Sequence, residues 1–149
     1  MKENINSIIR RKIDSIRRIE SFFCDSKNII QIENLCAKMV DTINAGGKII
    51  IGGNGGSAAD SQHMVAELIG RFKFNRKAIS GIALCSNLSN VTAIANDYGY
   101  EYVFSREIEA IAENRDLVLL ISTSGNSENI INAAQYCLKT NLSVFALTG

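Results

Sequence analysis

The stretch KIIIGGNGGSAADSQHMVAELIGRF, residues 48–72, decides the fold class of this chain. Its first residues form a short apolar run that is typical of a buried strand, and a glycine-rich turn follows directly. The turn opens a helical stretch that carries His63, the only histidine of the chain, and Glu67 four residues later. Residues at this spacing share a helix face. The stretch therefore predicts a strand–turn–helix unit that holds a small phosphorylated or hydroxyl-rich ligand.

The same alternation of strand-like and helical segments continues to the end of the sequence. Apolar runs without polar alternation favour strands that are buried on both faces of a parallel sheet. We expect strands at residues 48–51, 79–84, 117–121 and 144–147, and helices near 57–70, 88–95, 101–113 and 127–139. This order predicts an α/β fold, a doubly wound, Rossmann-like parallel sheet. Ligands of such sheets bind beyond the carboxyl ends of the strands.

Two amphipathic helices are expected ahead of the sheet. The first, over residues 4–23, repeats apolar side chains at helical spacing: Ile5, Ile8, Ile9, Ile13, Ile16, Ile19 and Phe23. The basic residues between them favour a solvated face over a nucleic-acid-binding arm, because the chain as a whole is nearly neutral. The second helix begins near Asp25 or Ser26 and ends at Ala45-Gly46-Gly47. We therefore expect a helical pair at 1–46 and a sheet domain at 47–149, with the apolar stripes packed on that domain, on a second subunit or on both.

Composition excludes several classes of function. The net charge of +1 gives no electrostatic reason to expect nucleic acid or a membrane surface as a partner. No apolar run approaches the length of a membrane span, and the polar, basic N-terminus does not read as a secretory signal. The four scattered cysteines are predicted to be reduced thiols, so a cytoplasmic location is expected: Cys24, Cys36, Cys85 and Cys137.

Two loops follow predicted strands at the same edge of the sheet. The first, residues 52–57, contains four glycines, and free N–H groups at the start of the next helix favour anions and hydroxyl oxygens. It is neither a P-loop nor a good dinucleotide fingerprint. The second loop, residues 122–127, reads STSGNS and also opens a helix, so it is a candidate phosphate site. The first loop could instead be a glycine-rich turn without a ligand, and the second an ordinary helix-capping cluster. The presence of two such loops at one edge of the sheet favours a ligand.

Three further positions have both a functional and a structural interpretation. His63 and Glu67 can jointly hold a divalent metal, but a lone histidine is more often structural. Glu67 is also four residues before Arg71, so it can instead form a surface ion pair. Asn96-Asp97 joins two predicted helices, where ordinary turn chemistry accounts for both residue types.

Four strings in this sequence together resemble the sugar isomerase (SIS) domain, and within that group the bacterial phosphoheptose isomerases. They are GGNGGSAADSQH, AELIGRF, TAIANDYGYEYVFSR and ISTSGNSENI, in order between residue 48 and the end. TSGNS marks SIS domains broadly, whereas GNGGSAAD followed by QH and AEL is much more specific. The resemblance implies interconversion of sedoheptulose 7-phosphate and D-glycero-D-manno-heptose 7-phosphate through a cis-enediol(ate), which supplies heptose for lipopolysaccharide or capsule.

The resemblance also implies a role for each matching residue. Sugar contacts would come from Asn54, Gly55, Gly56, Glu67, Asn96 and Asp97. Phosphate contacts would come from Ser122, Thr123, Ser124 and Ser127. Zinc would be bound by His63 and Glu67, and Glu67 would also serve as the catalytic acid/base. The family forms homotetramers with the N-terminal helices packed between subunits, which implies a homo-oligomer here.

One departure from the family concerns the C-terminal side. The family continues beyond the position of Gly149, and its last helix supplies a Gln and a second His that complete the zinc and acid/base site. With two of these ligands in 149 residues, we expect this chain, read as C-terminally truncated, to bind zinc weakly and to isomerise poorly. We also expect apolar surface on the last strand to be exposed, because no helix follows it.

Two functions of other classes stay open at this stage. The family also resembles a non-catalytic SIS adaptor that binds a replication initiator protein. An adaptor has no need of a carboxylate at Glu67, so the presence of Glu67 beside His63 favours the enzyme. The other is a SIS regulatory domain that senses a hexose phosphate, and the lack of a DNA-binding segment in this sequence argues against it.

Overall fold

The computed structural model describes residues 4–149, and the chain divides into two compact units, one up to Ala37 and one from Lys38 onward. The sequence analysis instead places the domain boundary after residue 46, where the second predicted helix ends. That boundary stays a prediction. The helices are α1 (Ile5–Cys24), α2 (Ser26–Asn44), α3 (Gly56–Ile69), α4 (Leu88–Asp97), the 3₁₀ turn η1 (Tyr100–Tyr102), α5 (Val103–Ile111) and α6 (Glu128–Lys139). The strands are β1 (Ile49–Gly53), β2 (Gly81–Ala83), β3 (Leu117–Ser122) and β4 (Ser143–Thr148).

The four strands form one parallel sheet in the order β2-β1-β3-β4, which confirms the predicted fold class. From β1 the chain crosses outward to β2, then returns past β1 to β3 and β4. The strand order therefore reverses between β1 and β3. In open α/β sheets the crevice beyond the carboxyl ends at such a reversal is the usual ligand site. The β1–α3 and β3–α6 loops both leave the sheet there.

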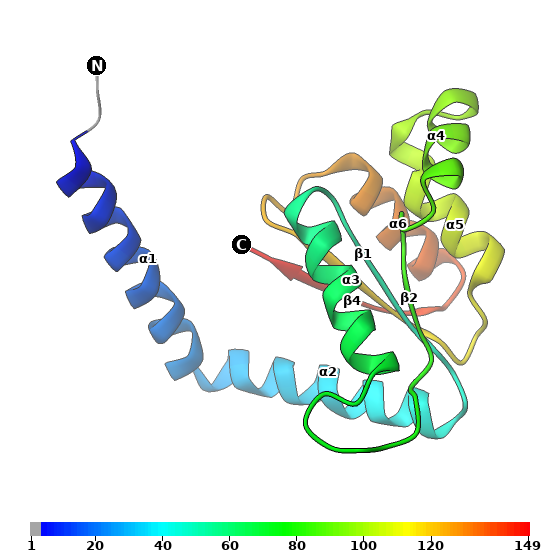
Figure 1. The fold of residues 1–149 in the computed structure, drawn as a ribbon, viewed down its shortest axis with the longest axis horizontal. Coiled ribbons are helices and arrows are strands. Elements are labelled where there is room, and N and C mark those ends of the chain that lie inside the picture. Colours follow the sequence, from blue (N-terminus) through cyan, green and yellow to red (C-terminus); the bar gives the residue numbers. More distant parts are fainter. Residues whose placement is uncertain (1–3) are drawn as a thin grey trace. The chain divides into compact units, whose positions relative to one another are not determined.

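Helices cover both faces of the sheet because its central strands are apolar on both sides. Ile49, Ile50 and Ile51 are completely buried, as are Leu117 to Leu120 of β3. One face packs on α5 and α6, which contribute Phe104, Ile108 and Ala133 to the core, while α3 packs on β1 and β2. Figure 1 shows α3 on one side of the strands and α5 and α6 on the other. β4 is less covered, and none of its residues is buried.

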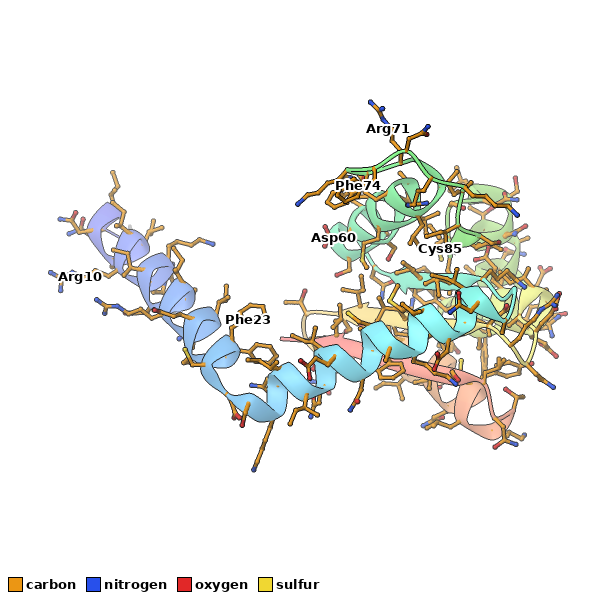
Figure 2. All side chains as sticks on the ribbon, turned by 90° about the horizontal axis from the view of Figure 1, so that it is seen from below. Arg10, Phe23, Asp60, Arg71, Phe74 and Cys85 are labelled. Atoms are coloured by element: carbon orange, nitrogen blue, oxygen red, sulfur yellow. The ribbon has the colours of Figure 1, made fainter. Side chains whose placement is uncertain are left out.

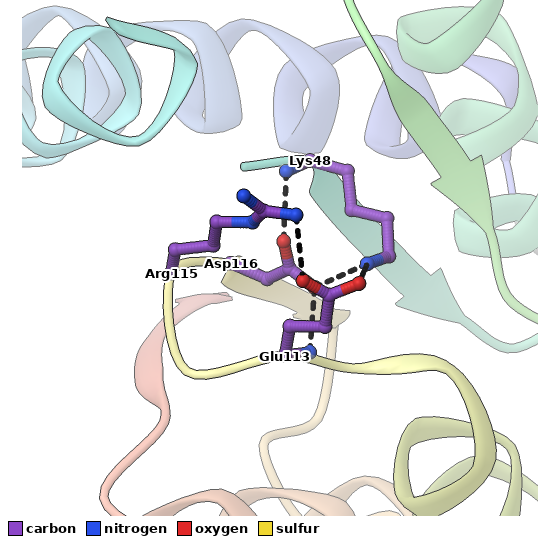
Figure 3. A network of polar contacts seen from close by, with 4 residues as sticks. All are labelled: Lys48, Glu113, Arg115 and Asp116. Atoms are coloured by element: carbon purple, nitrogen blue, oxygen red, sulfur yellow. Dashed lines mark hydrogen bonds and ion pairs between the residues drawn. The ribbon is translucent and has the colours of Figure 1, made fainter. Parts of the chain in front are cut away.

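A polar network ties the beginnings of β1 and β3 together, at the edge opposite the two loops (Figure 3). The Asp116 carboxylate is 1% exposed and accepts hydrogen bonds from the Lys48 N–H (2.8 Å) and the Glu113 N–H (2.7 Å). The Lys48 ammonium lies 2.6 Å from Asp116 Oδ2. Burial alone would raise the pKa of Asp116, but the hydrogen bonds from Lys48 and Glu113 and the charge of Lys48 outweigh it and lower this pKa.

The N-terminal unit contains α1 and the first part of α2. The Asn4 side chain caps α1 by accepting a hydrogen bond from the Asn6 N–H (3.1 Å). α1 buries none of its residues, and the apolar side chains from Ile5 to Phe23 are between 39% and 72% exposed in the single chain. Figure 2 labels Arg10 and Phe23, which project from this helix. The predicted amphipathic helix is confirmed.

Two predicted elements differ from the structure in extent. The expected strand at 79–84 shortens to β2, because the Ile79 N–H bonds to the Leu68 carbonyl at the end of α3 (3.1 Å) and not to a neighbouring strand. The expected helix at 101–113 is divided into η1 and α5. Gly99, with φ 103°, turns the chain sharply, and the Tyr102 N–H then bonds back to the Gly99 carbonyl (3.2 Å).

All four cysteines are unpaired. Cys137 is buried, and burial raises the pKa of its thiol to about 11. Cys85 is half-buried, and burial together with the negative charge of Glu107 raises the pKa of its thiol to about 12. Among residues 4–149, none of the helices has both the length and the apolar character needed to cross a membrane.

Candidate active site

The two loops predicted to share a sheet edge line one cavity. β1 and β3 are adjacent and parallel, so Gly53 and Ile121 pair in register and the chain leaves both strands at the same level. Beyond them lies a cavity of about 180 Å³, lined by Asn54, Ser57, Ile121, Ser122, Thr123, Ser124 and Ser127. The structure therefore brings Asn54 together with the four hydroxyl residues of the second loop.

The β3–α6 loop presents several donors to this cavity. Gly125 adopts φ 66°, and its N–H bonds to the Ser122 carbonyl (3.2 Å), which closes the loop into a tight turn. The Ser122 hydroxyl donates to Ser127 Oγ (3.4 Å), and Ser124 Oγ accepts from the Asn126 N–H (3.2 Å). No lysine or arginine lines the cavity among the described residues. An anion here would therefore be held by hydroxyl groups and by the N-terminus of α6.

The β1–α3 loop leaves part of its backbone open to a ligand. Gly55 is the N-cap residue of α3 and has no side chain with which to cap the helix. The Ser57 and Ala58 N–H groups bond back to the Asn54 carbonyl (2.9 and 3.4 Å), which starts the helix. A Cβ atom added at Gly55 or Gly56 would meet nothing within 4 Å, so this side of the loop is open. A small polar ligand can approach the backbone closely at this point.

The Asn54 side chain is held by two residues that the sequence analysis did not single out. Its amide forms a reciprocal pair with the amide of Asn129 on α6: Asn54 Nδ2 donates to Asn129 Oδ1 (2.8 Å) and Asn129 Nδ2 donates to Asn54 Oδ1 (2.9 Å). The Tyr100 hydroxyl also donates to Asn54 Oδ1 (3.0 Å). These residues border a second cavity of about 290 Å³, which shares Asn54 and Ser127 with the first.

His63 and Glu67 lie further along α3. His63 Nε2 is 3.8 Å from Glu67 Oε1, and the two side chains are 76% and 41% exposed. At about 1.5 Å per residue, Glu67 is roughly 15 Å along the helix axis from Ser57. Neither residue lines the two cavities beside Asn54. Glu67 lies beside His63, and among the described residues no ion pair joins it to Arg71, which was the alternative.

Asn96 and Asp97 form the C-terminal end of α4, next to the turn that carries Tyr100. Asn96 Nδ2 donates to Asp97 Oδ1 (2.8 Å), so the two side chains bond to each other. Neither lines the two cavities beside Asn54. The single chain thus unites the two loops but keeps Asn96-Asp97 and His63-Glu67 outside the cavities that these loops form.

Comparisons with known proteins identify the family of this chain. The SIS domain family model matches residues 13–149. The phosphoheptose isomerase of Campylobacter concisus is 43% identical over 146 residues, which cover 97% of this chain and 76% of that protein. The phosphoheptose isomerase of Akkermansia muciniphila is 45% identical over 149 residues, which cover the whole chain and 76% of that protein. The chain belongs to the phosphoheptose isomerase family.

Solved structures of family members share the fold. The phosphoheptose isomerase of Neisseria gonorrhoeae superposes with a TM-score of 0.83 and 35% identity, over 97% of this chain and 74% of that one. The phosphoheptose isomerase of Francisella tularensis gives a TM-score of 0.70 with 32% identity, over 91% and 75%. This chain spans about three quarters of the length of these family members and is an enzyme of the same family.

The expected zinc site can be tested against the donors that the structure holds. His63 and Glu67 are close enough to share a cation with modest adjustment. Zinc sites in proteins usually have three or four protein ligands. Within residues 4–149 of one chain, no group of three or more His, Cys, Asp or Glu side chains could hold a metal ion. The residues described here therefore do not make a complete zinc centre by themselves.

Proposed function

We propose that this phosphoheptose isomerase interconverts sedoheptulose 7-phosphate and D-glycero-D-manno-heptose 7-phosphate. The observation that carries the proposal is the meeting of the two loops at the reversal of strand order, where Asn54 and the serine-rich loop line one cavity. A sugar phosphate combines a dianion with a chain of hydroxyl groups, and the two loops offer matching donors for both parts. Family membership gives the reaction class.

The phosphate group would bind to the β3–α6 loop. Its oxygens would accept hydrogen bonds from the hydroxyls of Ser122, Thr123, Ser124 and Ser127 and from N–H groups at the start of α6. Neutral donors suit an enzyme that must release a phosphorylated product, because the phosphate is not held by a buried ion pair. The sugar end would then extend along Asn54, Gly55 and Gly56.

The reaction itself needs acid/base groups that move protons on carbon and on oxygen. In the ketose-to-aldose direction a base removes a proton from C1 and the C2 oxygen gains one, which forms the enediol. A proton then returns to C2 while the O1 proton leaves, so no atoms or electrons are gained overall. We assign the acid/base role to Glu67, with Asn96 and Asp97 as further sugar contacts. Because Glu67 lies outside the cavities of the single chain, this assignment requires the bound sugar to reach Glu67 in the working assembly.

His63 and Glu67 would contribute two ligands to zinc, which would stabilise negative charge on the sugar oxygens. A complete site needs further donors from outside the described stretch of one chain, so no step above depends on the metal. With two donors we expect weak zinc binding in a calorimetric titration, and none after His63→Ala. Submicromolar zinc binding that survives His63→Ala would contradict this ligand assignment.

Family membership also suggests the assembly and the cellular role of this chain. We propose a homo-oligomer, most simply a tetramer, in which the exposed apolar face of α1 meets other copies of this chain. The four unpaired cysteines favour a cytoplasmic enzyme. Its product would supply heptose for lipopolysaccharide or capsule.

A conversion assay tests the reaction. Purified protein is incubated with sedoheptulose 7-phosphate, and the aldose 7-phosphate is separated by anion-exchange chromatography. We expect the aldose to form slowly, because the described residues give an incomplete zinc site, and the Glu67→Gln variant to form none above the no-enzyme blank. A protein that binds sedoheptulose 7-phosphate but converts it equally well with Gln at position 67 would contradict the role of Glu67.

A further inference from the structure

The amide network around Asn54 joins three segments that are far apart in the sequence. Asn54 comes from the β1–α3 loop, Asn129 from the first turn of α6 and Tyr100 from η1. Asn129 is only 3% exposed, and no buried side-chain nitrogen or oxygen within residues 4–149 lacks a hydrogen-bond partner. Turning either amide alone by half a turn would place like groups together, so the pair fixes the plane of the Asn54 amide and ties its orientation to that of Asn129.

This network determines which atoms Asn54 can offer to a ligand. Asn54 Oδ1 already accepts two hydrogen bonds, one from Asn129 and one from Tyr100. One of the two Nδ2 hydrogens is used by Asn129 Oδ1, so one N–H remains. In this arrangement the group that Asn54 has left to offer a sugar is an N–H.

We propose that Asn129 is a positioning residue for the isomerase, which holds the Asn54 amide with its free N–H toward the sugar, and that Tyr100 supports it. The proposal rests on the proposed function, since it concerns the same site. Asn54 borders both cavities, one beside the serine-rich loop and one beside Tyr100, so it lies where the phosphate end and the carbon chain of a ligand would meet.

The chemistry of a sugar phosphate explains why this orientation matters. The hydroxyl oxygens of the carbon chain next to the phosphate end accept hydrogen bonds, so an N–H at this point can bind them. If Asn129 were apolar, the Asn54 amide could rotate by half a turn and present its oxygen to the ligand. The phosphate loop would keep its own donors, because its hydrogen bonds involve neither Asn54 nor Asn129.

The test compares two ligands, sedoheptulose 7-phosphate and inorganic phosphate, by isothermal titration of the full chain. We expect Asn129→Leu to weaken sedoheptulose 7-phosphate binding about tenfold and Tyr100→Phe to weaken it about threefold, the size expected for one lost or misdirected hydrogen bond. Phosphate affinity should change less than about twofold. The matched control is Gln135→Leu, which removes an exposed amide from the same helix and should alter neither affinity.

Two results would overturn the proposal, and a third would contradict the proposed function. Unchanged sedoheptulose 7-phosphate affinity in both Asn129→Leu and Tyr100→Phe would overturn the proposal, and so would an equal loss for both ligands, since that indicates general damage to the site. If Asn129→Leu fails to fold by circular dichroism, Tyr100→Phe decides, because it removes a single hydroxyl from a half-exposed ring. Failure of the unsubstituted chain to bind sedoheptulose 7-phosphate would instead contradict the proposed function.

Discussion

At the scale of single residues, the Ser124 hydroxyl is the clearest test of the phosphate loop. It lines the cavity and accepts a hydrogen bond from the Asn126 N–H, so it both shapes the loop and faces the ligand. We expect Ser124→Ala to weaken inorganic phosphate and sedoheptulose 7-phosphate by similar factors, about tenfold, because a hydrogen bond to a charged group is lost. Ser21→Ala on α1 is the control, and titration calorimetry is the measurement. Unchanged phosphate affinity in Ser124→Ala would place the phosphate elsewhere.

Asp116 is the residue on which the opposite edge of the sheet depends. We expect Asp116→Asn to lower the free energy of unfolding at pH 7 by about 2–4 kcal/mol, because Lys48 loses its buried partner. Glu113→Gln, at a side chain that is 57% exposed, should change it by less than about 0.5 kcal/mol. Urea denaturation of the three proteins gives both values.

The pH dependence of this effect has a defined sign. The pKa of Asp116 is lowered in the folded state, so its stabilising effect is fully present above the ordinary carboxyl pKa of about 3.9. The effect is lost as the pH falls through the lowered folded-state pKa. The difference in stability between the unsubstituted chain and Asp116→Asn should therefore shrink at acidic pH. A difference that stays constant from pH 7 to pH 2 would be inconsistent with an ionised, hydrogen-bonded Asp116.

The sequence analysis found the site residues that stand in recognisable loops but not the residues that hold them. Asn54 and the serine-rich loop follow apolar runs and precede helices, so their position at one sheet edge could be predicted. Asn129 and Tyr100 lie within or beside helices, where a polar residue is usually solvated. A buried Asn beside the apolar Ile130 is a weak signal, and its partner is 75 residues away in the chain.

At the scale of elements, the order and type of the strands and helices could be predicted because their apolar runs are long and uninterrupted. The errors occur where a local hydrogen bond competes with the pattern. Ile79 looks like the start of a strand, but its N–H bonds to the carbonyl of Leu68. The expected helix at 101–113 begins with the 3₁₀ turn η1, because the Tyr102 N–H bonds to the carbonyl of Gly99, three residues before it. The positions of α3 and α4 relative to the loops could not be predicted, so neither could the separation of Glu67 from the cavities.

The turn between β1 and α3 should tolerate a methyl group at one glycine and not at another. A Cβ at Gly53 would lie 2.6 Å from Ser57 Cβ and 2.7 Å from the Ser57 carbonyl oxygen, whereas a Cβ at Gly56 would meet nothing within 4 Å. We expect Gly53→Ala to cost about 1–3 kcal/mol in the free energy of unfolding. Gly56→Ala should be neutral or stabilising by up to about 1 kcal/mol. Equal melting temperatures for the two variants would show that the turn relaxes freely.

At the scale of the whole molecule, α1 is the feature that the single chain leaves without an explanation. A helix whose apolar face is exposed along its whole length is not stable in that state without a partner. We expect Ile9→Glu combined with Ile13→Glu to reduce the oligomer seen by sedimentation velocity. Lys12→Glu, which makes a similar charge change between these two positions, should leave it intact. An oligomer that survives the double substitution would place the subunit interface away from this face.

The central claim is that this family member forms an enediol from sedoheptulose 7-phosphate with Glu67 as the base. Solvent exchange tests it directly, because a proton removed from C1 in D₂O is replaced by deuterium even when little product accumulates. Proton NMR should show loss of one of the two C1 proton signals of sedoheptulose 7-phosphate with the unsubstituted chain and no loss with Glu67→Gln. Unphosphorylated sedoheptulose should exchange far more slowly. An unchanged C1 signal with the unsubstituted chain, or equal exchange by Glu67→Gln, would contradict the account.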